Sequence, residues 1–163
     1  MPAGSTYTPI ATTTLGSAAA NVTFNSFSGY TDLVLVFNGR CTSTGGWNLF
    51  LQFNSDTGTN YSATSLYGTG SSAVSGRGSN NSQLGGWFVD GTNVGTVIVQ
   101  IMNYSNTSTY KTVIGRGNNT GVGVDARVGL WRNTAAITSM LIYSNGGDWL
   151  AGSTFTLYGI ASA

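Results

Sequence analysis

The sequence contains no histidine and no glutamate, and its charge is limited to six basic and five acidic residues among 163. Acid–base and nucleophilic catalysis in proteins draws mostly on His, Glu, Asp, Lys or Cys side chains held close together. The five carboxylates are Asp32, Asp56, Asp90, Asp125 and Asp148. Nothing in their spacing places two of them side by side. We therefore expect no catalytic residues, no cofactor and no enzymatic activity.

Cysteine and long apolar runs are also scarce. Cys41 is the single cysteine, so an internal disulfide is excluded, and its strand-like surroundings favour a small buried apolar residue. The N-terminus has no basic region followed by an apolar run, which predicts no secretory signal. Because no stretch approaches about 20 consecutive apolar residues, we expect no membrane-spanning segment.

The net charge is +1, and charged residues make up 7% of the chain. Such a balance gives no strong attraction to nucleic acid or to an anionic membrane, so neither is expected as a partner. A net charge near zero favours self-association instead. Gly, Ser, Thr and Asn make up about half of the residues and keep the surface polar without charge.

The residues that are present form β-strand patterns almost throughout. Strong runs of β-branched and aromatic residues, or runs with period-two alternation, lie at 31–37, 47–54, 94–101, 136–143 and 153–160. Weaker strands are expected at 10–15, 20–24, 61–67, 86–89, 110–114 and 122–131. Gly-rich and Asn-Gly or Asp-Gly turns separate them, and no segment has a convincing helical period. The pattern predicts an all-β protein with a jelly-roll-like antiparallel β-sandwich.

The chain length fits one domain. We expect a flexible N-terminal arm over residues 1–9, which contains both prolines, and a β-sandwich domain over residues 10–163. Residues 68–85 are rich in Gly, Ser and Asn and are expected to form a long loop.

One short segment resembles a cation-binding loop. Asn54, Asp56 and Asn60 place oxygen ligands at alternate positions around a central glycine, which makes them a weak candidate for a calcium site. The segment lacks the acidic density and the closing glutamate of an EF-hand loop. A tight turn between two strands explains it more simply, so we expect no metal.

Arginine and tryptophan supply candidate contact residues. Arginine outnumbers lysine five to one, and its planar side chain is favoured at protein interfaces. The candidate interface residues are Arg40, Arg77, Arg116, Arg132, Trp87 and Trp149. The aromatic residues Trp47, Trp87, Trp131, Trp149 and Tyr61 could stack on sugars, but core or interface positions are the more common use of such side chains.

Several blocks resemble a group of tailed-phage virion proteins found in cyanophages and related marine or prophage genomes. These blocks are the strand segment at 24–36, the turn at 52–62, the run from Asn103 to Thr112 and the C-terminal segment at 152–160. They occur in consistent order over nearly the whole chain. Members of the group resemble capsid decoration (cement) proteins or the heads of fibres.

The resemblance implies a jelly-roll-like sandwich, a homo-oligomer with a trimer favoured, and no catalysis. It predicts a structural protein on the capsid exterior of the virion that binds the major capsid protein and stabilises the assembled lattice. An alternative is a tail-fibre or spike head that binds host-surface glycans. A cellular carbohydrate-binding module is a third possibility, with no linker or enzyme sequence to support it.

Overall fold

The computed structural model describes residues 6–161, which form an all-β antiparallel sandwich without a helix. In the first half of the chain the strands are β1 (Tyr7–Thr14), β2 (Asn21–Asn25), β3 (Asp32–Gly39), β4 (Trp47–Phe53), β5 (Tyr61–Gly68) and β6 (Ala73–Asn81). In the second half they are β7 (Leu84–Val89), β8 (Gly95–Ile101), β9 (Lys111–Asn119), β10 (Gly123–Trp131), β11 (Ser139–Ser144) and β12 (Thr154–Ile160). The predicted fold class is confirmed.

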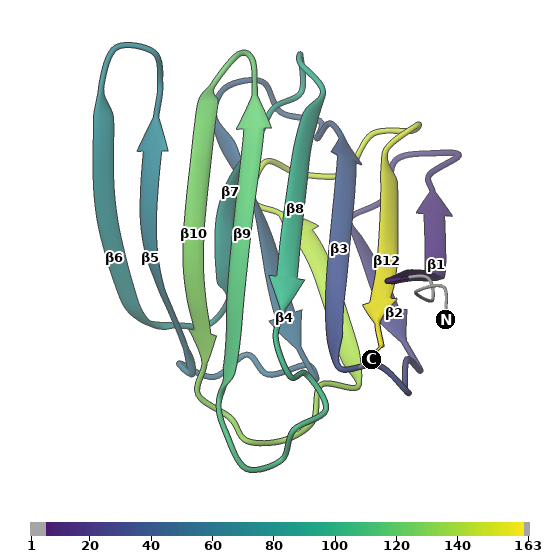
Figure 1. Ribbon diagram of the computed structural model, residues 1–163. Helices are drawn as coiled ribbons and strands as arrows, with labels where there is room; N and C mark the ends of the chain where they lie inside the picture. The colour runs from purple at the N-terminus through teal and green to yellow at the C-terminus, as the bar shows by residue number, and fades with distance from the viewer. Residues whose placement is uncertain (1–5, 162–163) are drawn as a thin grey trace.

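The two sheets of the sandwich differ in size. The large sheet has eight strands in the order β1-β12-β3-β8-β9-β10-β5-β6, and the small sheet has four in the order β2-β11-β4-β7. Figure 1 shows the large sheet in front, with the small sheet behind its middle and right-hand part. One face of the large sheet therefore carries no second layer.

The core lies between the sheets and is built by alternate residues of their strands. In β3, Leu33, Leu35 and Phe37 have no exposed surface, and β8 contributes its odd-numbered apolar residues in the same way. Aromatic rings fill the space at one end, where Trp149 packs against Phe37 with ring centroids 4.8 Å apart. Cys41 is buried and free, as expected.

The β5–β6 hairpin extends beyond the small sheet, which ends at β7 (Figure 1). The expectation of a long loop over residues 68–85 is wrong, because Ala73–Asn81 pairs with β5 as a full strand. Its Gly, Ser and Asn residues have low strand propensity. The hydrogen-bonding edge of β5 gives them a partner, so tertiary context overrides local preference.

The N-terminal boundary also differs from the expected one. Residues 1–5 of the predicted arm lie outside the described part of the chain, but Tyr7, Thr8 and Pro9 belong to β1 and pair with β12. The sheet thus begins within the segment that was expected to be a flexible arm. No helix in residues 6–161 is long and apolar enough to cross a bilayer.

Candidate functional site

Strand β10 has the opposite orientation to the one that its sequence pattern suggests. Its apolar residues Val124 and Val128 are 60% and 52% exposed, whereas Asp125 is 5% exposed and lies on the inner side. In a half-buried strand the apolar side normally faces the core. The inner side of β10 also carries Gly129 and Trp131, and the indole of Trp131 has no exposed surface. Because side chains alternate, burial of Trp131 places the apolar row outside.

The inward carboxylate of Asp125 connects the two sheets. Its Oδ2 accepts a hydrogen bond of 2.8 Å from the backbone N–H of Phe88, on the free edge of β7. The Nε of Arg127 lies 3.7 Å from Oδ1 of Asp125, and neither of these two atoms has a hydrogen-bond partner within residues 6–161. Burial raises the pKa of Asp125, against the opposing effects of the Phe88 hydrogen bond and the Arg127 charge. Asp125 therefore links β10 to β7 of the small sheet, and burial partly disfavours the ionised form of its carboxyl group.

The outward residues of four neighbouring strands form a surface on which apolar side chains alternate with uncharged polar ones, which we call the outer face. Val128 lies opposite Ile114 of β9, and Leu66 of β5 lies opposite Ala126 of β10. Leu66 is 60% exposed and Ile114 is 45% exposed. The surface continues across β8 through Ile98, which pairs with Val36 of β3. Large contiguous apolar patches on protein surfaces mark contact sites.

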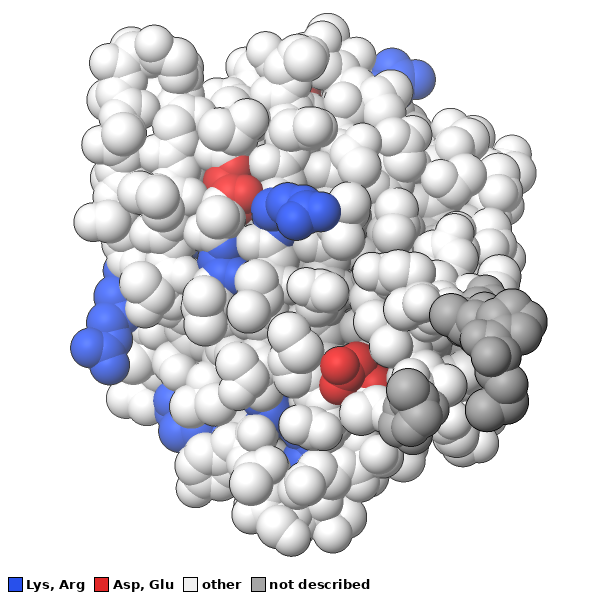
Figure 2. Space-filling view, in the orientation of Figure 1, with Lys and Arg blue, Asp and Glu red and all other residues white. Residues whose placement is uncertain are grey.

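Charge is sparse on this face. Figure 2, which views the large sheet from outside, shows a mostly uncharged surface, with an acidic residue beside a basic one in its upper central part and further basic residues toward the left and lower edges. Arg116 is exposed on β9, between Ile98 and Ala126 in the pairing register. The outer face therefore offers apolar contact with one central cation.

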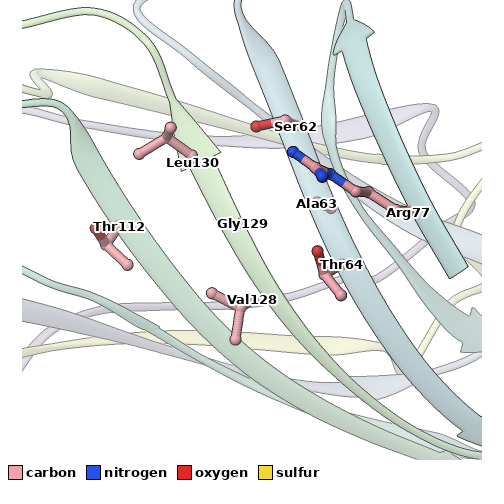
Figure 3. A pocket seen from close by; sticks show the side chains of 8 residues that line it. All are labelled: Ser62, Ala63, Thr64, Arg77, Thr112, Val128, Gly129 and Leu130. Carbon is pink, nitrogen blue, oxygen red and sulfur yellow. The ribbon is translucent and has the colours of Figure 1, made fainter. Parts of the chain in front are cut away.

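The outer face is shallow rather than cleft-like. Four hollows of about 220 to 340 Å³ lie on it. Figure 3 shows the smallest, where Val128 and Leu130 of β10 lie beside Thr64 and Ser62 of β5, and Arg77 reaches in from β6. None of these hollows encloses a cluster of titratable side chains, and no group of three or more His, Cys, Asp or Glu residues that could hold a metal occurs within residues 6–161. The geometry suits contact with another broad surface.

The four candidate interface arginines lie in different environments. Arg77 and Arg116 are exposed on the large sheet. Arg132 is half-buried and donates to the carbonyl of Thr59 at 2.6 Å and to Oδ1 of Asn80 at 3.0 Å, so it connects the turn before β5 to the end of β6. Arg40 is half-buried in a loop. Arg77 and Arg116 are thus available for contact at the outer face, while Arg132 supports the fold.

The two candidate interface tryptophans are a correction. Trp87 is 1% exposed and Trp149 is 0% exposed, so both belong to the core of one chain and neither can reach a partner. Trp87 lies directly over Gly115, where an added Cβ would be 2.3 Å from the indole. The sequence shows that these residues are large and aromatic, but it does not show that a second sheet packs over them.

The aromatic residues considered for sugar stacking are mostly buried as well. Trp131 and Tyr61 have no exposed surface, and of that set only Trp47 retains partial exposure. The expectation that core positions are the more common use of these side chains holds for four of the five.

The candidate calcium ligands do not converge. Nδ2 of Asn60 donates to Oδ2 of Asp56 at 2.9 Å, but Oδ1 of Asn54 accepts the N–H of Thr138 at 2.8 Å, on a different loop. Asp56 also accepts the indole N–H of Trp131 at 2.7 Å. Burial opposes ionisation of Asp56, yet the hydrogen bonds from Trp131, Asn60 and the Gly58 N–H outweigh it and lower its pKa. Its oxygens are occupied by donors, and the carboxylate acts as the anchor of the turn.

Lys111 is a buried cation that the sequence analysis did not single out. It has no exposed surface, and its Nζ donates to the carbonyls of Thr109 and Thr134 at 2.9 and 3.0 Å. Burial lowers its pKa. The lysine thereby ties the start of β9 to the loop after β10. Its sequence position beside exposed Tyr110 gives no sign of this.

Comparison with known proteins adds little to the assignment. No protein-family model and no curated protein matches the chain. Two solved structures of the alginate lyase Aly36B, double mutants in complex with an alginate trisaccharide and an alginate tetrasaccharide, are 13% and 11% identical to it. They cover 91% and 93% of this chain and 80% of their own, with TM-scores of 0.34 and 0.33.

The expectation that the chain has no enzymatic activity is corrected by this comparison. The two solved structures found are those of an enzyme, and the expectation is withdrawn. At these TM-scores the similarity assigns no activity, substrate or site to this chain.

Proposed function

We propose that the chain is a structural protein of a phage virion, namely a capsid decoration protein that binds the assembled capsid lattice through its outer face. The inverted orientation of β10 carries the proposal. A strand that exposes Val124 and Val128 and buries Asp125 lowers the folding stability of an isolated chain, because apolar side chains left in water contribute no hydrophobic free energy. The same arrangement is favourable when a partner covers it.

The dimensions of the large sheet support a protein partner. Eight strands spaced about 4.8 Å apart, with rises of about 3.3 Å per residue, give a face of roughly 35 by 22 Å, or about 800 Å². A standard protein–protein interface buries about 800 Å² on each side. The exposed side of the whole large sheet, of which the outer face is one part, is therefore large enough for a stable contact.

The charge of the face supports a partner that is not a polyanion. Arg116 is the exposed cation at its centre, whereas nucleic-acid interfaces require clustered basic residues. A face with little charge also loses little desolvation energy when it is covered. The blocks of sequence that resemble phage virion proteins point to the same partner, the major capsid protein.

Lattice binding would stabilise a capsid through mass action, since a ligand that binds only the assembled form shifts the equilibrium toward it. Self-association into a homo-oligomer, with a trimer favoured by the resemblance, would add avidity on a repeating lattice. The alternative of a glycan-binding fibre head has weaker support, because four of the five aromatic candidates for sugar stacking lie in the core.

Substitution of Val128 by lysine tests the proposal. Val128→Lys adds a charge at the centre of the outer face, where the native side chain is already 52% exposed, so the fold and its thermal midpoint should change little. An unpaired charge buried in a contact is costly, and binding to capsids that lack the protein should weaken at least about tenfold. Sedimentation of the variant with such capsids measures the loss.

Thr23→Lys is the matched control, because Thr23 is exposed on β2 of the small sheet. It should bind as the unmodified protein does. Equal binding by Val128→Lys and the unmodified protein would overturn the outer face as the contact surface, and no binding by the unmodified protein would overturn the function.

A further inference from the structure

The sandwich has four strands at sheet edges, and three of them are protected against pairing with another chain. An edge strand exposes unpaired backbone N–H and C=O groups, and natural proteins block such edges with proline, bulges, short strands or covering groups. Edge strands β1 and β6 bound the large sheet, and β2 and β7 bound the small sheet.

Each of the three protected edges has a visible device. In β1, Pro9 lacks an N–H, and the register shifts between Pro9 and Ala11. β2 has five residues, the shortest strand described. In β7, the N–H of Phe88 is taken by Asp125 of β10 at 2.8 Å, and the pairing with β4 is irregular beside Phe50.

Strand β6 has a register shift at its end, between Gly78 and Asn81, but no proline or bulge over residues 73–78. It spans nine residues without proline, and residues 73–78 pair with β5 in continuous register. Its residues are exposed or half-buried throughout, because the small sheet ends before it. Because partners alternate across an antiparallel pair, every second residue of β6 directs its N–H and C=O away from β5. Figure 1 shows this free edge at the side of the molecule.

We propose that β6 pairs antiparallel with β6 of a second copy of the chain, about a twofold axis, so that the two large sheets become one continuous sheet. A twofold contact brings the same two edges together and leaves neither exposed, which is the usual geometry of a homodimer. After pairing, the remaining sheet edges of both copies are the protected ones. This inference does not rest on the function proposed above, and it gives a twofold homodimer in place of the trimer that the resemblance favours.

The charge of β6 is compatible with pairing to a second copy in a register that keeps the two arginines from facing each other. Arg77 is the charged residue of the strand. In the register centred on Gly76, Arg77 faces Ser75 of the second copy, and the two guanidinium groups are out of line. Glycine at the centre and at position 78 lets the backbones approach without side-chain conflict. The net charge of +1 adds little long-range repulsion between copies.

The contact is small. One strand pair buries less than the roughly 1,600 Å² of a standard interface, so the dimer should depend on protein concentration. Its two outer faces would lie on the same side of one sixteen-stranded sheet, since each copy contributes eight strands.

A charge placed at Ser75 tests the pairing and its register together. In Ser75→Lys, each new lysine faces Arg77 of the second copy, and like charges directly opposite each other weaken a strand pair. We expect the dimer dissociation constant, measured by sedimentation over a dilution series, to rise about tenfold. The mass of the unmodified protein should move from 16.9 kDa toward twice that value as concentration rises.

Thr14→Lys is the matched control, because it adds the same charge on the opposite edge strand β1, where Thr14 is exposed. It should dimerise normally. Amide hydrogen exchange locates the contact: residues 73–78 should gain protection on dimerisation, while the outer-face strands should not. A circular dichroism spectrum and thermal midpoint equal to those of the unmodified protein show that Ser75→Lys is folded.

A protein that stays monomeric throughout the series overturns the proposal. So does a dimer that Ser75→Lys leaves unchanged, an oligomer of three copies with no protection of β6, or protection confined to β8, β9 and β10.

Discussion

Replacement of Gly115 by alanine should lower the free energy of unfolding by about 2–4 kcal/mol. Gly115 lies on the inner side of β9, directly beneath the indole of Trp87. A Cβ at this position would lie 2.3 to 2.7 Å from three atoms of that ring. Trp87 is 1% exposed and packed in the core, so it cannot move aside without displacing neighbours. Urea denaturation followed by tryptophan fluorescence measures the change.

Gly16→Ala is the matched control for this substitution. No atom of a residue beyond its two chain neighbours lies within 4 Å of its added Cβ, and Gly16 does not adopt a positive φ. Its free energy of unfolding should stay within about 1 kcal/mol of the unmodified value, on the stabilising side. A loss of less than about 1 kcal/mol in Gly115→Ala would mean that Trp87 does not pack on β9 as described.

Replacement of Asp56 by alanine should cost about 2–3 kcal/mol of folding free energy. The carboxylate accepts hydrogen bonds from Trp131 Nε1 at 2.7 Å, from Asn60 and from the Gly58 N–H at 2.9 Å. Its removal leaves the indole N–H of Trp131 without an acceptor in the core. Asp148→Ala removes an exposed turn aspartate instead and should change the unfolding free energy by less than about 0.5 kcal/mol.

The effect of Asp56→Ala should depend on pH in a defined direction. The pKa of Asp56 is lowered in the folded protein, so its ionised form contributes stability in full above the unfolded value of 3.8. That contribution is lost as the pH falls through the lower folded pKa. The difference in unfolding free energy between the two proteins should therefore be constant near neutral pH and shrink below about pH 4. A difference that grows on acidification would contradict the hydrogen-bonded turn.

Much of the fold is readable from local sequence. Period-two runs such as Trp47–Phe53, with Leu49 and Leu51 buried, locate both the strand and its inner side. Each of the predicted strands overlaps an observed one. The observed strand that was not predicted is β6, which was expected to be loop, because strand formation there depends on β5 and not on its own residues.

The side of a strand that faces the core, and the roles of the charged residues, were harder to predict from the sequence. Asp125 and Arg127 alternate with valines in a pattern that favours an outward charged side, but the small sheet and Trp131 fix the opposite orientation. The partner of Asp56 lies 75 positions along the chain, so the turn was recognisable while its anchor was not. Trp87 and Trp149 are core residues for the same reason: which sheet covers them is a property of topology.

The outer face of the large sheet as a protein-contact surface is the central claim, and electron cryomicroscopy of intact virions tests it most directly. We expect one copy or a symmetric group of copies at fixed lattice positions, with β8, β9 and β10 against the capsid and Val128 in the contact. Particles in which those strands face solvent while another surface meets the capsid, or particles without the protein, would contradict it.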